Sequence, residues 1–135
     1  MKLYRKITII NIKKPENDNV NEELKYLGSA LGLFGIRDKD KSCYRIFLEL
    51  LKAAKMGVGI SSDELAYRLN LSRGTVVHHL NKLIETGIAI NTKSRYYLRE
   101  DNLKFVITRI KKDINESINE LISIAQSIDN TIGLK

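Results

Sequence analysis

Two helix-start signals, Ser61 and Ser72, lie so close together that only a short helix and a tight turn fit between them. Ser61 and Glu64 have the spacing of a capping box, in which each side chain satisfies a free amide at the helix start. Ser72 caps a second helix, and Gly87 follows that helix at a position where a left-handed residue ends many helices. The pattern predicts a short helix that stops near Asn70, a turn, and a longer helix that runs up to the glycine.

Each of these helices has one apolar face, which indicates that they pack on a common core. Apolar residues every three or four positions place one helix face inside and leave the other in water. A further helix is expected before them, capped by Asp38 or Asp40 and ended by Gly57 and Gly59. The predicted inner faces, in chain order, are Tyr44, Phe47, Leu48, Leu51 and Ala54; Leu65, Ala66 and Leu69; and Val76, Leu80, Leu83 and Ile84.

Two β-rich segments after the third helix predict a hairpin of residues 88–99. The segments IAIN and RYYL flank Thr92-Lys93-Ser94, and basic residues lie at the turn. Three helices followed by a basic hairpin is the order of a winged helix-turn-helix domain, here residues 40–100. In such a domain the third helix enters the major groove of DNA, and the wing reaches the backbone or the minor groove.

The face of the third helix that points away from the core is the candidate DNA-binding surface, and on a helical wheel it contains no acidic side chain. An arginine, an imidazole and an amide can read base edges, a glycine lets the backbone come close, and a valine can meet a thymine methyl group. The wing would add phosphate contacts, although the same charges also suit an ordinary solvated turn. The predicted DNA-binding residues are Ser72, Arg73, Gly74, Thr75, Val77, His78, Asn81 and Lys82 of the helix and Lys93, Ser94 and Arg95 of the wing.

The net charge of +7 is concentrated in two segments. Residues 1–14 contain five basic and no acidic side chains, and residues 65–99 contain six basic side chains against Glu85 alone. The segments 15–64 and 100–135 are slightly acidic. A positive field favours a polyanion through counterion release. Because the field coincides with the predicted third helix and wing, double-stranded DNA is the expected partner.

The stretch SSDELAYRLNLSRGTVVHHLNKLIETGIAI, followed by SRYYL, resembles the winged helix of ArsR-type transcriptional regulators over residues 42–100. The resemblance implies a winged-helix, DNA-binding regulator. MarR-type regulators share the topology, but the wing here lacks their acidic-arginine signature. The residues that carry the resemblance are Leu65-Ala66, Leu71-Ser72, Thr75-Val76, His78-His79-Leu80, Leu83, Gly87-Ile88 and Tyr97-Leu98.

The chain departs from this family at the metal site. ArsR-type metal sensors carry a Cys-x-Cys pair just before the Leu-Ala of the second helix, where this chain has Ser61 and Asp63. His78 and His79 are adjacent, and adjacent side chains point about 100° apart on a helix, so they do not chelate as an i,i+4 pair would. No metal site is therefore expected.

The segment before the winged helix, residues 1–39, is expected to form an extension of one strand and one helix. Residues 3–12, LYRKITIINI, are β-branched and partly alternating, which predicts a strand, and residues 13–21 read as a loop. A helix is expected from Glu22 to about Phe34. Its apolar spacing is helical, and its glycines would allow close packing.

Residues 102–130 predict one long helix whose apolar residues alternate by four and three. A period of 3.5 sustained for nearly four heptads, interrupted only at Ser117, is a coiled-coil signal. Packing on the chain's own core is the alternative, but the helix is longer than a small domain covers. Residues 101–135 are therefore predicted to join two subunits through Leu103, Ile107, Ile110, Ile114, Leu121, Ile124 and Ile128.

Several other functions find no support in the sequence. There is no Ser-His-Asp spacing, phosphate loop or HExxH motif, so an enzyme is not expected. Cys43 has no partner for an internal disulfide and reads as a small core residue, with an intermolecular disulfide or a redox sensor as the alternative. The apolar runs are shorter than the ~20 residues that cross a bilayer, and the N-terminus lacks a cleavage site, so a cytoplasmic protein is expected.

Together these features predict an α+β, mostly helical winged helix-turn-helix protein without cofactors. Its expected function is sequence-specific binding of double-stranded DNA as a homodimeric transcriptional regulator, a repressor that occludes a promoter; the pattern specifies no small-molecule effector. One alternative is a winged-helix protein-interaction module within the transcription machinery, which would tolerate acidic residues on the third helix and the wing. Another is an adaptor whose N-terminal segment binds a second chain.

Overall fold

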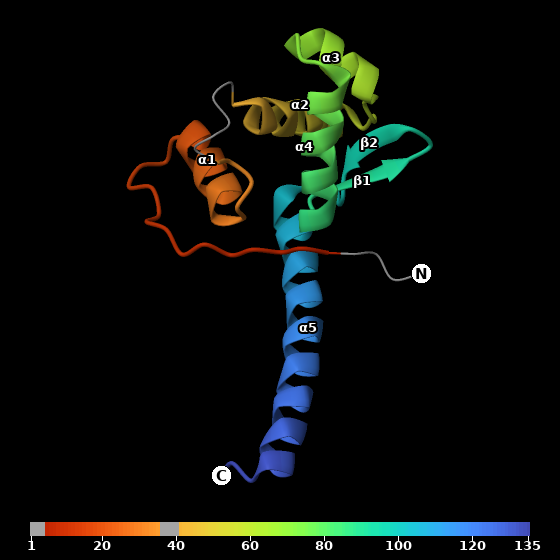
Figure 1. Cartoon of the computed structure of the whole chain (residues 1–135). Coiled ribbons are helices and arrows are strands. Elements are labelled where there is room, and N and C mark those ends of the chain that lie inside the picture. The colour runs from red at the N-terminus through yellow and green to blue at the C-terminus, as the bar shows by residue number, and fades with distance from the viewer. Residues whose placement is uncertain (1–4, 36–40) are drawn as a thin grey trace.

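The structure is a computed structural model that describes residues 5–35 and 41–135. Within these residues the chain forms five helices and a two-stranded antiparallel sheet, which confirms the α+β, mostly helical winged-helix fold. The helices α2, α3 and α4 pack with the hairpin at one end of the molecule, and α5 extends away from them (Figure 1). The elements are α1 Val20–Ala30, α2 Ser42–Met56, α3 Ser62–Leu69, α4 Arg73–Thr86, β1 Ala89–Thr92, β2 Arg95–Leu98 and α5 Leu103–Ile132.

Both predicted serine caps are present. The Oγ atom of Ser61 accepts a hydrogen bond from the backbone amide of Glu64 at 3.1 Å, and Oγ of Ser72 accepts one from the amide of Thr75 at 3.1 Å. Gly87, with φ of 93°, ends α4 in the left-handed conformation. These short-range signals place both helices and the turn between them where the sequence predicts them.

The helix α2 begins and packs differently from the prediction. Lys41 precedes it in the left-handed conformation, and its side chain makes no capping hydrogen bond; the predicted caps Asp38 and Asp40 lie outside the described residues. The buried face is also rotated, because α2 is apolar around most of its circumference and the wheel does not single out one stripe. Its buried apolar residues are Cys43, Ile46, Phe47, Leu50 and Ala53, while Tyr44, Leu48, Leu51 and Ala54 are half-buried.

The core lies among α2, α3 and α4, and the start of α5 closes one side of it. Each large aliphatic side chain that leaves water contributes about 1.5–3 kcal/mol, so this cluster dominates the stability of the domain. The largest fully buried side chains are Phe47, Leu33, Ile46, Leu50, Ile60, Leu65, Leu80, Leu83, Ile88, Ile110, Val76 and Val106.

The wing is a tight hairpin with one additional strand contact. Thr92 pairs with Arg95, which leaves Lys93 and Ser94 as a two-residue turn, one residue shorter than the predicted connection. Both turn residues have positive φ, 52° and 64°, as a type I′ turn requires. A bridge between Ile60 and Tyr96, with backbone hydrogen bonds of 3.0 and 2.8 Å, fastens the wing to the segment that precedes α3.

The predicted N-terminal strand is wrong. Within the described part of residues 3–12 the chain is extended but joins no sheet. Instead the backbone amide of Lys6 donates to the carbonyl oxygen of Glu85 at 3.1 Å, and the backbone amide of Ile10 donates to the carbonyl oxygen of Ala30 at 2.7 Å. Residues 5–12, called here the N-terminal strap, are extended but form no strand, because their amides bind carbonyl groups near the C-terminal ends of α4 and α1 and not another strand.

The helix α1 is shorter than expected. It begins at Val20, where the side chain of Asn19 accepts hydrogen bonds from the first turn, and it ends at Ala30 rather than near Phe34. Gly32, with φ of 72°, takes the left-handed conformation just after the helix and ends it, and the chain that follows packs against Gly28. A Cβ atom there would collide with the ring of Phe34, so the chain folds back across the glycine and places Phe34 beside α1.

The helix α5 is used in two ways along its length. Val106 and Ile110 are buried in the domain core, and Leu103, Ile107 and Ile114 are half-buried against it. Beyond Ile114 every residue of the helix is exposed, and this part extends clear of the domain (Figure 1). Of the residues that the structure describes, none form a helix with the length and apolarity needed to cross a membrane.

Candidate nucleic-acid interface

The exposed face of α4 presents the polar side chains that the wheel predicts. Arg73, His78 and Asn81 are exposed, whereas Val77 is half-buried beside them. Val76 and Leu80, on the opposite side, are fully buried. The apolar side of α4 therefore fixes the helix in the core, and its other side is free to contact a partner.

The N-terminus of α4 is suited to an anion. Its first turn contains no acidic residue, and its unpaired amides carry the partial positive charge of the helix dipole. The hydroxyl of Ser72 donates to that of Thr75 at 2.8 Å, so these two side chains complete the cap and are already engaged. The Nε atom of Arg73 lies 3.8 Å from Oδ1 of Asp63, and both side chains are largely exposed. Such an ion pair is weak, so Arg73 can exchange Asp63 for a phosphate or a base edge.

Gly74 lies in the same first turn and is not required by the packing. Apart from its chain neighbours and the nearby backbone of α4 itself, no described atom lies within 4 Å of the position that a Cβ atom would occupy, and its φ is not in the left-handed region. The fold would therefore accept alanine here. A bare backbone at this exposed position is suited to close approach by a ligand.

The wing presents a single basic side chain at its turn. Lys93 is exposed beside Ser94. Arg95 instead turns back to the domain, where Nη1 donates to the carbonyl of Gly59 at 3.1 Å and lies 3.5 Å from Oε1 of Glu64. The sequence predicts DNA contacts for both cations, but the structure gives Arg95 a role in fastening the wing.

Lys82 lies on the flank of α4 and also has an internal partner. Its Nζ atom donates to the carbonyl of Leu33 at 3.2 Å and so ties α4 to the N-terminal extension. Beside it is a polar hollow of about 540 Å³ whose lining includes Lys6, His78, Asn81 and Lys82. The sequence alone does not single out Lys6 as a site residue, and the basic character of residues 1–14 is the only signal that points to it.

A cluster of two arginines and one aspartate holds the strap, the wing and α5 together. Nη1 of Arg99 lies 2.9 Å from Oδ2 of Asp113, and Nε of Arg5 lies 3.8 Å from the same oxygen. Arg5 also donates to the carbonyl of Ile84 at 2.7 Å. Burial lowers the pKa of Arg5 from its usual value, and the nearby Arg99 lowers it further, while Asp113 opposes both effects. The N-terminal strap is thus part of the domain.

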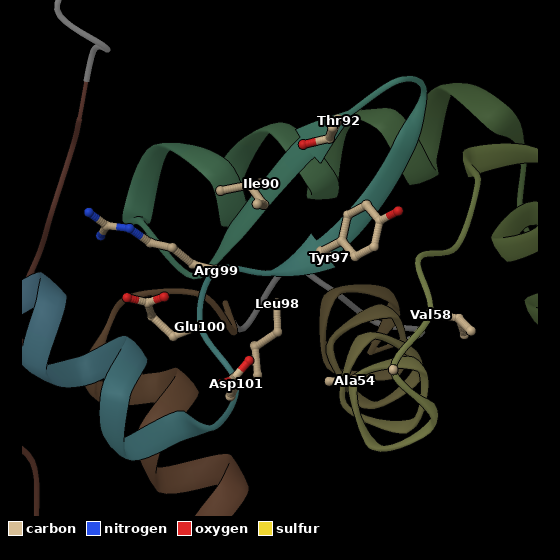
Figure 2. Close-up of a pocket in the computed structure, with 10 residues that line it drawn as sticks. Ala54, Val58, Ile90, Thr92, Tyr97, Leu98, Arg99, Glu100 and Asp101 are labelled. Carbon is tan, nitrogen blue, oxygen red and sulfur yellow. The ribbon is translucent and has the colours of Figure 1, made fainter.

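The other side of the wing is less suited to an anion. A shallow hollow of about 620 Å³ lies between the wing and the end of α2. Figure 2 shows Ile90 and Tyr97 along its wing side, Ala54 and Val58 on the other side, and Glu100 and Asp101 below the strands. The two carboxylates oppose phosphate binding, so the favourable electrostatic surface is the α4 side.

The positions that correspond to thiols in metal sensors have structural roles here. Ser61 caps α3, and Asp63 pairs with Arg73. Among residues 5–35 and 41–135, no group of three or more His, Cys, Asp and Glu side chains is placed to hold a metal ion.

These features define a winged helix-turn-helix domain with a polar recognition face. Residues 40–91 match the family model of a helix-turn-helix domain, and this range includes α2, α3, α4 and most of β1. Such domains occur in DNA-binding regulators, and this coarser assignment supports that class for the chain. The match is to helix-turn-helix domains in general, so the ArsR-type resemblance stays a prediction. No curated protein and no solved structure gave a match.

Proposed function

We propose that this protein is a sequence-specific DNA-binding transcriptional regulator that works as a homodimer. The observation that carries the proposal is the exposed face of α4, where Arg73, Gly74, His78 and Asn81 follow one another along one side of the helix from its capped start. A helix of this kind fits the major groove, and these side-chain types read base edges there. Lys93 at the wing turn and Lys6 beside α4 would add phosphate contacts on either side.

The proposed dimer is supported by the end of α5. Leu121, Ile124 and Ile128 are 62%, 60% and 51% exposed, although they lie on one side of a helix that leaves the domain. Exposed apolar stripes of this length mark interaction surfaces. Ile110, which the sequence analysis assigned to the dimer, is only 2% exposed and belongs to the core of its own subunit. The fully exposed part of the proposed dimer surface is therefore the stripe beyond Ile114, while Leu103 and Ile107 are half-buried beside their own domain.

Repression by promoter occlusion is the simplest consequence of this arrangement. Two linked recognition helices bind two half-sites, which raises affinity and fixes the spacing of the sites at a multiple of about 10–10.5 base pairs.

The proposal is tested by DNA binding with and without the α4 arginine. Selection from a random duplex library should yield a preferred site, and Arg73→Ala should weaken binding to it by about 1–3 kcal/mol while relaxing the sequence preference. Lys112→Ala, which removes an equal charge from the exposed surface of α5, is the control and should leave that preference unchanged. Failure of the wild-type protein to bind any duplex would overturn the proposal and favour a protein-interaction winged helix.

A further inference from the structure

The two halves of α5 carry opposite charges. Residues 103–112 contain Lys104, Arg109, Lys111 and Lys112 and no acidic side chain. Residues 113–134 contain Asp113, Glu116, Glu120 and Asp129 and no lysine or arginine. Asp113 is turned to Arg99 of its own subunit, but the other three acidic residues lie on the part of α5 that extends beyond the domain. The helix is therefore basic near the domain and acidic away from it.

One apolar stripe passes through both halves. Ile107, Ile114, Leu121 and Ile128 recur every seventh residue and so fall on nearly one side of the helix. Leu121 and Ile128 are exposed, whereas Ile107 is half-buried. The stripe thus begins on the domain and continues into solvent, where none of the described residues of this subunit covers it.

Beside the start of the stripe is an apolar groove of about 430 Å³ between α1 and α5. Its apolar lining includes Val20, Leu24 and Leu27 from α1 and Leu103 and Ile107 from α5. Lys14 and Lys104 also line it, with Glu23 as the one acidic residue of the lining. The groove combines apolar side chains with excess positive charge, and an acidic amphipathic helix has the complementary surface.

From these observations we infer that two copies of α5 pair in antiparallel orientation, so that the acidic half of each lies along the basic half and the α1–α5 groove of the other. The inference rests on the proposed dimer and adds its geometry. In a parallel pair the like-charged halves would lie side by side and both grooves would stay open. In the antiparallel pair both apolar surfaces are covered, and opposite charges face each other within about one Debye length.

The charges and the stripe agree on one register. Alignment of the basic residues with the acidic ones places the twofold axis near Asn115 and Glu116. Leu103 then lies opposite Ile128 of the partner subunit, and Ile107 lies opposite Ile124 of the partner subunit. Ser117, the one polar residue of the stripe, falls close to the axis opposite Ile114. A small residue at that point lets the two helices approach closely.

Disulfide trapping distinguishes the two orientations. In a Cys43→Ala background, Leu103→Cys combined with Ile128→Cys should give a covalent dimer under mild oxidation, while either cysteine alone should not. With 1.5 Å of rise per residue, two copies of position 128 lie about 37 Å apart in the antiparallel pair, far beyond the ~7 Å that a disulfide allows between Cα atoms. Efficient crosslinking of the Ile128→Cys single variant would establish a parallel pair and overturn the inference, although the dimer and its DNA binding would stand.

Charge reversal provides an independent measurement. Replacing Glu116, Glu120 and Asp129 with lysine should weaken the wild-type dimer about tenfold or more at low salt in sedimentation experiments. Reversing Lys104, Lys111 and Lys112 to glutamate in the same chain should restore it, because the two halves are again complementary. In a parallel pair the lysine variant would dimerise about as well as the wild type, since mutual repulsion of positive charges would replace mutual repulsion of negative charges. That result would contradict the inference.

The groove is tested separately, because a dimer of the distal halves alone would leave it uncovered. Val20→Asp places a carboxylate at the edge of the groove and should weaken dimerisation about tenfold. Val58→Asp is the matched control, since Val58 is similarly exposed but lies at the wing side of the domain. Equal dimer affinity for the Val20 variant and the wild type would remove the groove from the interface. A wild type that sediments as a monomer at micromolar concentration would instead refute the dimer itself, and DNA binding would still be measured independently.

Discussion

Arg99 and Asp113 lie 2.9 Å apart, and this ion pair joins the residue that follows the wing hairpin to the first half of α5. The side chain of Arg99 is 9% exposed and that of Asp113 is 26% exposed, so the pair is largely shielded from water. Arg5 contacts the same carboxylate from the N-terminal strap. One acidic side chain therefore connects three segments that are distant in the sequence, and two guanidinium groups share its single negative charge.

Asp113→Asn should consequently destabilise the fold. The amide keeps the shape of the carboxylate but leaves two shielded cations facing each other without a counter-charge, which we expect to cost about 1–3 kcal/mol. Urea unfolding at a fixed protein concentration measures the loss. Asp18→Asn, in the exposed loop before α1, is the control and should change the stability by less than about 0.5 kcal/mol. Equal stability of Asp113→Asn and the wild type would show that the cluster has no structural importance.

Gly74→Ala separates folding from DNA binding at one position. Alanine is the better helix former by about 0.5–1 kcal/mol, and nothing in the structure obstructs its methyl group, so the variant should be more stable than the wild type. The same methyl group would lie where the backbone of α4 meets DNA, and we expect about tenfold weaker binding. Thermal unfolding and filter binding give the two values. A more stable protein with unchanged DNA affinity would place the N-terminal turn of α4 away from the DNA.

Ser94→Gly should stabilise the wing. Ser94 has φ of 64°, and an L-residue in the left-handed region costs about 1–2 kcal/mol, whereas glycine has no such penalty. We expect a gain of about 1 kcal/mol with DNA affinity unchanged, because Lys93 stays at the turn. Thr92→Gly, one step outside the turn, should instead weaken the hairpin, since a strand residue is lost. A loss of stability in Ser94→Gly would contradict the two-residue turn.

The parts of the fold that the sequence predicts are those fixed by neighbouring residues. Ser61, Ser72 and Gly87 satisfy backbone groups within their own helix ends, so the bounds of α3 and α4 follow from local chemistry. The sequence predicts a strand in place of the N-terminal strap because the hydrogen-bond partner of Lys6, the carbonyl of Glu85, lies far along the chain. No local pattern marks such a carbonyl as available.

The same reasoning explains where the predicted site and the structure differ. A helical wheel places Lys82 in solvent, and a hairpin diagram does the same for Arg95. In the structure Lys82 donates to the carbonyl of Leu33 and Arg95 donates to the carbonyl of Gly59. Both carbonyl groups are distant in the sequence and come near only when the chain folds. Ile110 differs for another reason. The apolar residues that pack on the core and those proposed to face a partner helix lie on the same side of α5. The periodicity of α5 therefore does not show where the core-packed part ends and the partner-facing part begins.

The two wing cations should therefore respond differently to substitution. Lys93→Ala removes an exposed charge at the turn and should reduce the salt dependence of DNA binding by about one unit, with the order of preferred sites unchanged. Arg95→Ala removes the link to Gly59 and should mainly lower stability, by about 1 kcal/mol. Binding measured from low to moderate salt, with unfolding measured in parallel, separates the effects. A salt slope reduced more by Arg95→Ala than by Lys93→Ala would return Arg95 to the DNA surface.

The last prediction concerns the division of α5 between core and partner. Ile110 is 2% exposed, so Ile110→Ala should leave a cavity and cost about 2–5 kcal/mol of folding stability. Ile124 is 60% exposed and lies beyond the domain, so Ile124→Arg should leave each subunit folded. An arginine in the middle of the exposed stripe would have to be buried between two helices or force them apart, and the protein should then sediment as a monomer. A monomer contacts one half-site in place of two, so its affinity for the preferred DNA site should fall at least about tenfold. If Ile124→Arg is instead a dimer of wild-type affinity, the end of α5 does not join the subunits, and the exposed stripe must bind a different partner.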